Sequence, residues 1–317
     1  HAAISSKGGQ GMKSQAKQTA SGVCAYLKKL GYTTVEPEYY TTIQDWLDWY
    51  MNGADDNHKS KYWNGITTVT REIKSLGMAK TVCETWANLL MNEKVQISIE
   101  PESVNDTIHE VLDFNDFEGN TNELCEKYCA LGTGAFIEYM KDDQIFIEYI
   151  MANMIFPLSW DSTGIKECAF ASQRHDKNIG DYLYIQMHVL NESGMYQIKN
   201  HMVQITENDS FKEIELPDDM EPVTDLHQDI PLFQIVKPKQ VNNVDIYNPM
   251  GISIYANAID VLKEIDTTFD AFDIEIRTGR RKILMSGEGF TVDENGTQHN
   301  VIDDNEEVLK LVGEASA

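Results

Sequence analysis

The charged side chains between Gly251 and Met285 have the most suggestive types and spacing in the sequence. Acids recur there at helical intervals, and Lys263 is the only base among them. The acids are Asp260, Glu264, Asp266, Asp270, Asp273 and Glu275. Like charges at this spacing repel one another, and carboxylates near a helix C-terminus oppose the helix dipole. Helix stability alone therefore does not explain them, and the alternative interpretation is the solvated face of an ordinary core helix.

A basic cluster follows the acids directly. It consists of Arg277, Arg280, Arg281 and Lys282. Cations near a helix C-terminus compensate the helix dipole, but the chain continues here into an expected strand. We therefore expect these charges at the tip of the helix, where another molecule can reach them.

Residues with the chemistry for catalysis do not form a recognisable set. The segment His109–Asp113 begins like a zinc-protease helix but ends in Asp, and Cys125 and Cys129 have no second ligand pair nearby. No serine lies in a nucleophile elbow, and "GGQGMKS" lacks the adjacent Gly and Lys of a phosphate-binding loop. The sequence predicts no catalytic residues, no metal site and no cofactor. A less favoured hypothesis is a metal-dependent nuclease that uses Asp303, Asp304, Glu306 and Glu307.

An apolar seam accompanies the acids over three heptads. Its steps alternate between three and four residues, which is typical of helices that pack along their length. The seam consists of Tyr255, Ala258, Leu262, Ile265, Phe269, Phe272 and Ile276. About 26 helical residues would span roughly 40 Å. The segment thus predicts a long rod with an apolar flank and an acidic back.

The composition limits the classes of function. The chain has 317 residues with 26 Lys and Arg against 51 Asp and Glu, a formal net charge of −25. Proteins that grip nucleic acid through its phosphates usually have the opposite balance. The five cysteines lie in apolar contexts, which indicates reduced, buried thiols. No apolar run is long enough to span a membrane and no cleavable leader is recognisable, so we expect a protein of the cytoplasm.

The remaining elements predict an α+β fold. Residues 1–20 are small, polar and basic, as in a flexible arm, and helical periodicity follows from Ser21 to Met51 and over 62–92. Met78, Val82, Trp86, Leu89 and Leu90 form the expected buried stripe of the second helix. Val95–Ile99 alternates like a strand, and two more helices are expected at Val104–Phe117 and Asn120–Leu131.

After Gly132–Gly134 the sequence becomes typical of an antiparallel sheet. Short β-branched and aromatic runs alternate with turn residues, including a hairpin loop at Asn191–Gly194. An irregular linker, Pro238–Pro249, leads into the acidic helix, and Asn295-Gly296 indicates a later hairpin.

Three stretches resemble the portal proteins of tailed bacteriophages, in particular the SPP1-type portal family. They are "LGMAKTVCETWANLLMNEKVQI" (Leu76–Ile97), "ALGTGAFIEYMKDDQIFIEYIMANMIFPLSWDSTGIKECAF" (Ala130–Phe170) and "NPMGISIYANAIDVLKEIDTTFDAFDIEIRTGRRKILM" (Asn248–Met285). The last is the closest match. The similarity is distributed over roughly residues 35–312, which makes it more specific than a single motif.

The resemblance implies a ring of subunits, usually twelve, at one vertex of the capsid, with DNA passing through its centre. It implies a wing of helices and antiparallel strands (35–250), a stem helix (251–278) and part of a small β-containing clip (279–317). The residues before the wing, 1–34, are expected to be a flexible N-terminal arm from their composition. The family's returning stem helix and crown have no counterpart in this sequence.

The resemblance also implies roles for the residues above. Asp260, Glu264, Asp266, Asp270 and Asp273 would face the channel, because a conduit must not bind the duplex that it conducts. We expect Asp266→Lys with Asp270→Lys to leave ring formation intact but to slow DNA passage. The seam residues would pack neighbouring stem helices, and Arg277, Arg280, Arg281 and Lys282 would contact partners at the clip.

The partners that the resemblance implies are copies of the chain itself, the terminase packaging motor, the head–tail adaptor, the major capsid and scaffolding proteins, and double-stranded DNA that is not read by sequence. Assembly would occur in the bacterial host cytoplasm, and the product would be part of the virion. An alternative is a head–tail adaptor or tail protein that shares only the coiled-coil rod.

Overall fold

The computed structural model describes residues 9–52, 58–63, 68–91, 95–176, 180–205, 211–217, 220–279, 282–285, 290–292, 298–300 and 307–310. The chain separates into two units. The first contains residues 1–72 and 77–262, and the second contains residues 73–76 and 263–317. The short segment 73–76 thus belongs with the C-terminal part of the chain, although both of its flanks belong to the first unit.

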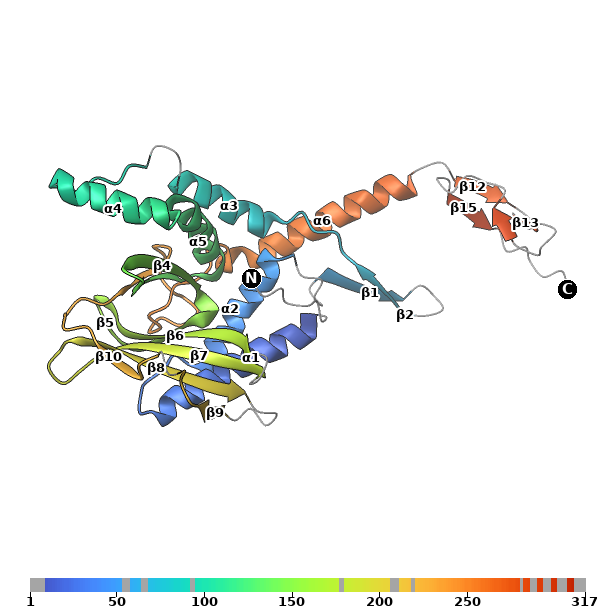
Figure 1. Cartoon of the computed structure of the whole chain (residues 1–317). Coiled ribbons are helices and arrows are strands. Elements are labelled where there is room, and N and C mark those ends of the chain that lie inside the picture. The colour runs from blue at the N-terminus through green and yellow to red at the C-terminus, as the bar shows by residue number, and fades with distance from the viewer. Residues whose placement is uncertain are drawn as a thin grey trace. The chain divides into compact units, whose positions relative to one another are not determined.

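Helices dominate the N-terminal part of the first unit (Figure 1). They are α1 (Gly9–Lys29), α2 (Pro37–Tyr50), α3 (Met78–Leu90), α4 (Glu102–Phe114) and α5 (Phe117–Leu131). The two helices predicted between Val104 and Leu131 are confirmed as α4 and α5. Gly132, with φ of 83°, ends α5, as expected for a residue that must adopt the left-handed conformation.

A six-stranded antiparallel sheet follows. Its strands are β5 (Ile155–Asp161), β6 (Gly164–Asp176), β7 (Gly180–Leu190), β8 (Tyr196–Ile205), β9 (Phe211–Ile214) and β10 (Val223–Asp225). Strands β5 to β8 form the predicted meander, and Asn191–Gly194 turns the chain between β7 and β8. A smaller sheet has the order β11 (Phe233–Val236), β3 (Gly134–Lys141) and β4 (Gln144–Met151). This mixture of helices and antiparallel sheets confirms the α+β class.

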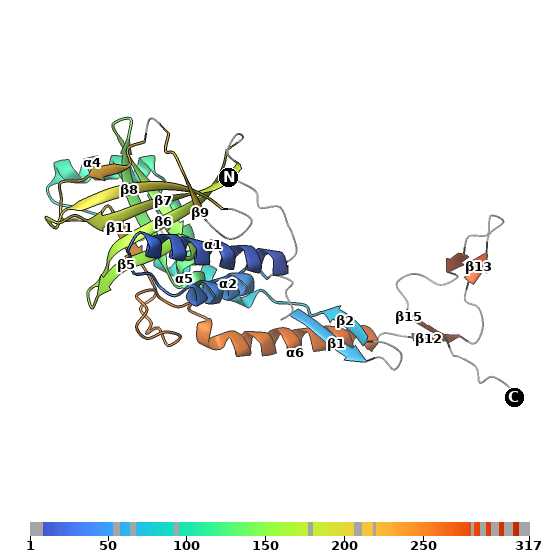
Figure 2. The same ribbon diagram turned by 90° about the horizontal axis from the view of Figure 1, so that it is seen from below.

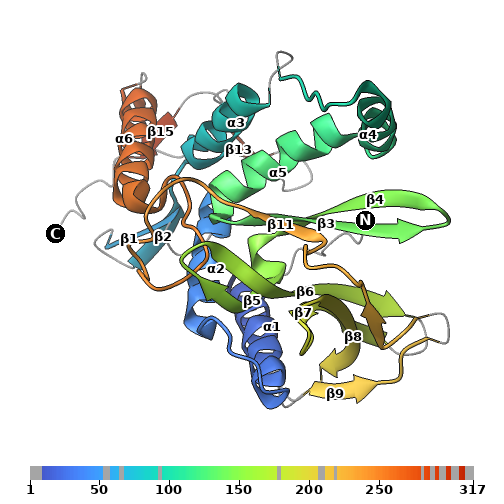
Figure 3. The same cartoon turned by 90° about the vertical axis from the view of Figure 1, so that its left-hand side faces the viewer.

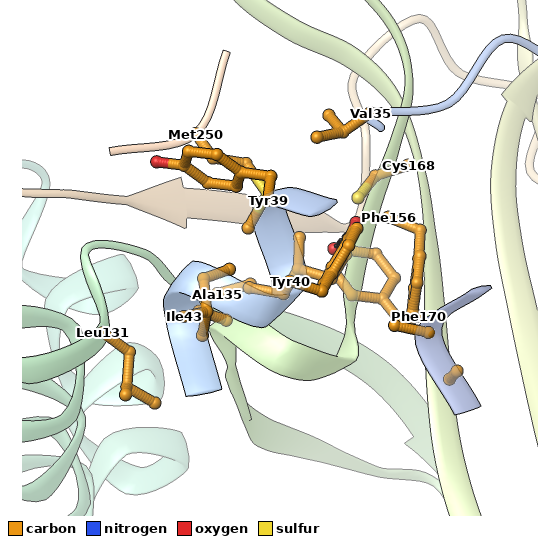
Figure 4. Close-up of a cluster of buried hydrophobic side chains, with 14 of the residues drawn as sticks. Val35, Tyr39, Tyr40, Ile43, Leu131, Ala135, Phe156, Cys168, Phe170 and Met250 are labelled. Atoms are coloured by element: carbon orange, nitrogen blue, oxygen red, sulfur yellow. Dashed lines mark hydrogen bonds between the residues drawn. The ribbon is translucent and has the colours of Figure 1, made fainter. Parts of the chain in front are cut away.

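The core of the first unit lies where α2 meets the sheets, and Figure 4 shows its side chains. Tyr40 stacks on Phe156 with ring centroids 4.8 Å apart, and its hydroxyl donates a hydrogen bond of 2.8 Å to the carbonyl oxygen of Ile155. Ile43 and Trp46, on the same side of α2, are almost fully buried. Helix α2 is therefore held by the face that its apolar spacing predicts.

Residues 1–34 were predicted to be a flexible arm, but Gly9–Lys29 of this range form helix α1. Val23, Cys24, Tyr26 and Leu27 are buried, and Figures 2 and 3 show α1 running along the six-stranded sheet. The Tyr26 hydroxyl donates a hydrogen bond of 3.2 Å to Glu213. The first twenty residues are polar and basic, so their composition did not predict α1. The C-terminal half of this helix is nevertheless part of the core.

The helix predicted over residues 62–92 is wrong in its first half. Strands β1 (Lys59–Trp63) and β2 (Thr68–Glu72) pair there as an antiparallel hairpin, and only α3 is helical. The buried stripe was also wrong, because α3 buries Ala79, Cys83 and Ala87. Trp86, Leu89 and Leu90 are exposed instead. Small residues on α3 allow a close approach to α5, which large side chains would prevent.

Two further predictions concern single segments. Residues Val95–Ile99 are not a strand, and the carbonyl oxygen of Ile97 lies 3.0 Å from Nε2 of His109 in α4. The cysteines behave as predicted, since all five are unpaired thiols buried in the fold. Burial raises the pKa of Cys24 to about 11 and of Cys129 to about 12, which keeps both thiols protonated near neutral pH.

The second unit contains most of α6 (Ile259–Thr278) and four short strands. These are β12 (Lys282–Met285), β13 (Phe290–Val292), β14 (Gln298–Asn300) and β15 (Glu307–Lys310). Strands β13 and β14 are antiparallel, whereas β12 and β15 are parallel. The hairpin residues predicted between β13 and β14, Asn295 and Gly296, lie outside the described residues.

Candidate functional surfaces of helix α6

Helix α6 starts from a segment that is fixed in the first unit. The backbone N–H of Gly251 donates to Thr133 Oγ1 at 3.0 Å, and that of Ile254 donates to the carbonyl oxygen of Cys129 at 2.9 Å. The Tyr255 hydroxyl reaches the carbonyl oxygen of Trp46 at 2.7 Å. A single turn of 3-10 helix, Ala256–Ala258, then leads into α6 at Ile259. The base of α6 is therefore positioned by buried hydrogen bonds.

Tyr39 and Asn242 complete this base. The Tyr39 hydroxyl donates to the carbonyl oxygen of Gly251 at 2.8 Å, and Nδ2 of Asn242 donates to the Tyr39 oxygen at 2.8 Å. Asn242 also donates to the carbonyl oxygen of Met250 at 3.0 Å. Both side chains are buried, so the loss of either partner would leave unsatisfied polar atoms at a cost of roughly 1–3 kcal/mol.

Tyr255 and Leu262 of the predicted inter-subunit seam are used inside the chain. Their exposed fractions are 3% and 8%, so neither offers surface to a neighbour in this structure. Ile265 and Phe269 are half-buried. The structure thus splits the predicted seam into an anchored beginning and a more exposed end.

The acids of α6 are divided between two sides of the helix. Asp266 and Asp270 are buried, with exposed fractions of 5% and 4%, and they hold the segment Ile73–Leu76. Asp266 accepts hydrogen bonds from the Leu76 backbone N–H and the Ser75 hydroxyl, both at 2.9 Å. Asp270 accepts one from the Lys74 backbone N–H at 3.2 Å. Hydrogen bonds to a charged group of this kind contribute roughly 1.5–3 kcal/mol each.

Asp273 extends the same row. Its carboxylate lies 2.8 Å from Lys74 Nζ and 3.1 Å from Arg277 Nε, one helical turn further on. The hydrogen bond from Lys74, followed by the charges of Lys74 and Arg277, lowers the pKa of Asp273. Asp266, Asp270 and Asp273 therefore face their own chain, and Figure 1 shows the connection between β2 and α3 passing along α6.

Asp260 and Glu264 lie on another side of α6, with Glu275 at a compatible spacing. All three side chains are exposed. At 100° per residue, these positions form one strip on the side of the helix away from Asp266 and Asp270. Of the predicted channel-facing acids, Asp260 and Glu264 are the two with free access to solvent in this structure.

A third side of α6 is apolar and open to solvent. Phe272 is 62% exposed and Ile276 is 47% exposed, and half-buried Ile265 precedes them on the same side. Val261, which the seam did not include, is 60% exposed and joins this side by its spacing. We call Val261, Ile265, Phe272 and Ile276 the apolar stripe. A stripe of this size on an exposed helix is typical of an interaction surface.

Of the predicted basic cluster, the structure places Arg277 at the end of α6, paired with Asp273. Arg280 and Arg281 lie outside the described residues, and Lys282 begins β12. The contact of this cluster with a partner stays a prediction.

Two observations limit other chemistry. Within the described residues, no group of three or more His, Cys, Asp or Glu side chains is arranged to hold a metal ion. The helices in the described part of the chain include none with the length and apolar character that crossing a bilayer requires.

In chain order, a sheet-rich unit is followed by a long helix with acidic and apolar sides and then by a small β-containing segment. The sequence pattern of the family described as phage portal protein, SPP1 Gp6-like, matches residues 32–314. The chain therefore belongs to this family of phage portal proteins. No curated protein sequence matches it.

Proposed function

We propose that copies of this chain form a closed ring at the unique vertex of a phage capsid and that double-stranded DNA passes through the ring during packaging and ejection. The family match over residues 32–314 supports this function. The observation that carries it is the division of α6 into three sides, because a subunit in a conduit needs one side for its own fold, one for a neighbour and one for the channel.

The channel side is the strip of Asp260, Glu264 and Glu275. Exposed carboxylates repel phosphates, so the duplex stays hydrated and does not release counterions to the wall. Asp266, Asp270 and Asp273 were expected on this side too, but their hydrogen bonds to residues 74–76 favour an internal role. We assign the channel contact to the exposed acids.

The neighbour side is the apolar stripe. In a rotational ring each subunit presents one surface to the next and receives a different surface from the previous one. Phe272 and Ile276 are large, exposed and on the same side of the helix, so their burial would favour this contact. In this proposal, residues 35–250 form the wing, 251–278 the stem and 279–317 the clip.

The ring also acts as a docking platform. We propose twelve subunits, the number usual for portals. Arg277, Arg280, Arg281 and Lys282, at the junction of stem and clip, would contact the terminase motor and the head–tail adaptor, and the remainder would contact capsid and scaffolding proteins. Assembly takes place in the bacterial host. Of the acids in the nuclease hypothesis, Asp303, Asp304 and Glu306 lie outside the described residues and Glu307 begins β15. No described feature favours that hypothesis.

The test is the assembly state of the purified protein. Negative-stain imaging and native mass spectrometry should show annular particles with an open centre and a fixed number of subunits. Binding to a preformed portal ring without self-assembly would instead support an adaptor. Cleavage of DNA that depends on divalent metal would support a nuclease.

A paired substitution tests the stripe. Phe272→Gln with Ile276→Gln should raise the subunit concentration at half-assembly at least tenfold, since each buried apolar side chain contributes about 1.5–3 kcal/mol. The thermal midpoint of the monomer should change little because both side chains are exposed. The control is Met140→Gln with Ile145→Gln, two exposed apolar residues of the β3–β4 hairpin. Equal weakening by both pairs would remove the stripe from the interface.

A further inference from the structure

The segment Ile73–Leu76 has an unusual set of hydrogen-bond partners. It forms no helix or strand, yet Lys74 and Leu76 both donate their backbone N–H groups to side chains of α6. The acceptors are carboxylates nearly two hundred residues away in the sequence. In a sheet these donors would bond to a neighbouring strand, so here two aspartates take the place of a strand backbone.

The row of acceptors is built into the helix. Asp266, Asp270 and Asp273 follow at steps of four and three residues, which places them on one side of α6. Ser75 adds its hydroxyl to Asp266 at 2.9 Å, and Lys74 adds its ammonium group to Asp273 at 2.8 Å. Asp266 and Asp270 are buried, whereas Asp260 and Glu264 of the same helix are exposed. The two buried acids of α6 are thus the same two that accept hydrogen bonds from residues 74–76.

We propose that Ile73–Leu76 is a strap, fastened to α6 by Asp266, Asp270 and Asp273, and that it makes the connection between β2 and α3 move together with α6. The three aspartates are positioning residues in this view. They fix one side of the helix to its own chain, which leaves the acidic strip and the apolar stripe for other contacts.

The strap is independent of the proposed portal function, because every contact that defines it lies within one chain and one unit. It explains why a helix would tolerate several acids on one side. The strap supplies two backbone donors, one hydroxyl and one ammonium group, so these carboxylates accept hydrogen bonds that offset their mutual repulsion.

Hydrogen exchange tests the fastening in the full chain. In Asp266→Ala with Asp270→Ala, amide exchange in a peptide that covers residues 73–77 should become at least tenfold faster than in the unchanged protein. The matched control, Asp260→Ala with Glu264→Ala, removes two acids from the exposed strip and should leave that exchange unchanged. Equal exchange in both variants would overturn the proposal.

A cross-link tests the same contact while Asp270 and Asp273 still hold the strap. The pair Ser75→Cys and Asp266→Cys should be joined by a short bifunctional thiol reagent, because Ser75 Oγ lies 2.9 Å from Oδ2 of Asp266. The pair Ser75→Cys and Glu264→Cys should not, since Glu264 faces solvent. The native thiols are buried and compete little. Failure of the first pair to cross-link, or equal cross-linking by both pairs, would show that the strap does not lie on this side of α6.

Discussion

His188 is a base enclosed by aromatic rings in the middle of the large sheet. Its exposed fraction is 0%, and neither ring nitrogen has a hydrogen-bond partner among the described residues. The rings of Phe170 and Phe233 meet it edge-on at 5.5 and 5.4 Å, and Cys168 lies opposite it in the strand register. Burial lowers its pKa from 6.5 to about 4. The folded protein therefore prefers the neutral imidazole.

The low pKa predicts a loss of stability in acid. The unfolded chain binds a proton at His188 near its usual pKa, while the folded chain resists it, so stability falls as the pH drops from about 6.5 to about 4. The full difference corresponds to roughly 3 kcal/mol. Urea unfolding at pH 7.5 and pH 4.5 measures the loss, which should be smaller by about this amount in His188→Leu.

An exposed histidine supplies the control. His175→Leu removes an imidazole that pairs with Asp181 at the surface, and urea unfolding of this variant at the same two pH values gives the comparison. If His188→Leu loses as much stability in acid as the unchanged protein does, the imidazole is not the group that responds.

At the scale of elements, the backbone at the end of α5 passes very close to the backbone of the segment that leads into α6. Gly132 ends α5 with φ of 83°, and a Cβ atom there would lie 2.6 Å from the carbonyl carbon of Ile252. A Cβ atom on Gly251 would in turn clash with the carbonyl oxygen of Gly132. Two glycines are needed because neither backbone can retreat without breaking the hydrogen bonds of Gly251 and Ile254.

This close approach predicts unequal costs for two alanine substitutions. Gly132→Ala should lower the free energy of unfolding by more than about 2 kcal/mol, through both backbone strain and the clash with Ile252. Gly194 has a similar φ of 78° but no atom within 4 Å of an added Cβ. Gly194→Ala should therefore cost only about 1 kcal/mol. Denaturant unfolding of both variants checks this, and equal costs would mean that the two backbones can move apart.

The elements that could be predicted from the sequence are those with a clear local period. Strands β3, β4, β6, β7 and β8 and helices α4 and α5 were recognisable because their apolar residues repeat at the spacing of their own structure. The β1–β2 hairpin was missed although Asn64-Gly65, a two-residue turn signal, lies in the sequence between the two strands. The burial of α3 was misassigned because the helix buries its small residues and not its large ones.

The candidate surfaces were only partly predictable for a different reason. The helical period predicted on which side of α6 the acids and the apolar residues lie, but it could not predict what each of them would contact. Asp266 and Asp260 look alike in sequence, and only the fold brings Ser75 and Leu76 to one of them. A tertiary contact nearly two hundred residues apart leaves no local signal.

At the scale of the whole molecule, the three sides of α6 would give an order to assembly in the proposed ring. The strap and the buried base position the helix within one chain, so the subunit presents a formed surface before it meets a neighbour. The apolar stripe then adds contact area without much reorganisation, which lowers the entropic cost of association. Around the axis of α6, the acidic strip lies beside the apolar stripe. In the proposed ring the strips of adjacent subunits would repel one another, and salt or counterions would weaken that repulsion.

The acidic strip predicts the behaviour of the conduit toward DNA. Asp260→Lys with Glu264→Lys should leave ring formation intact, because both side chains are exposed and outside the stripe, but should slow DNA passage. Phosphates would bind the introduced ammonium groups and release counterions, so the delay should be largest at low ionic strength and shrink as salt is added. Packaging and ejection rates measured over a salt series give the readout. Glu221→Lys with Asp229→Lys, the same change in charge at exposed residues outside the acidic strip, should leave the rates unaltered. The double substitution Asp266→Lys with Asp270→Lys is a poor test of DNA passage. It would remove the hydrogen bonds between α6 and the strap, so a change in rate could come from the altered fold of the subunit. If the Asp260 and Glu264 variant conducts DNA at the unchanged rate at every salt concentration, these two acids do not line the path.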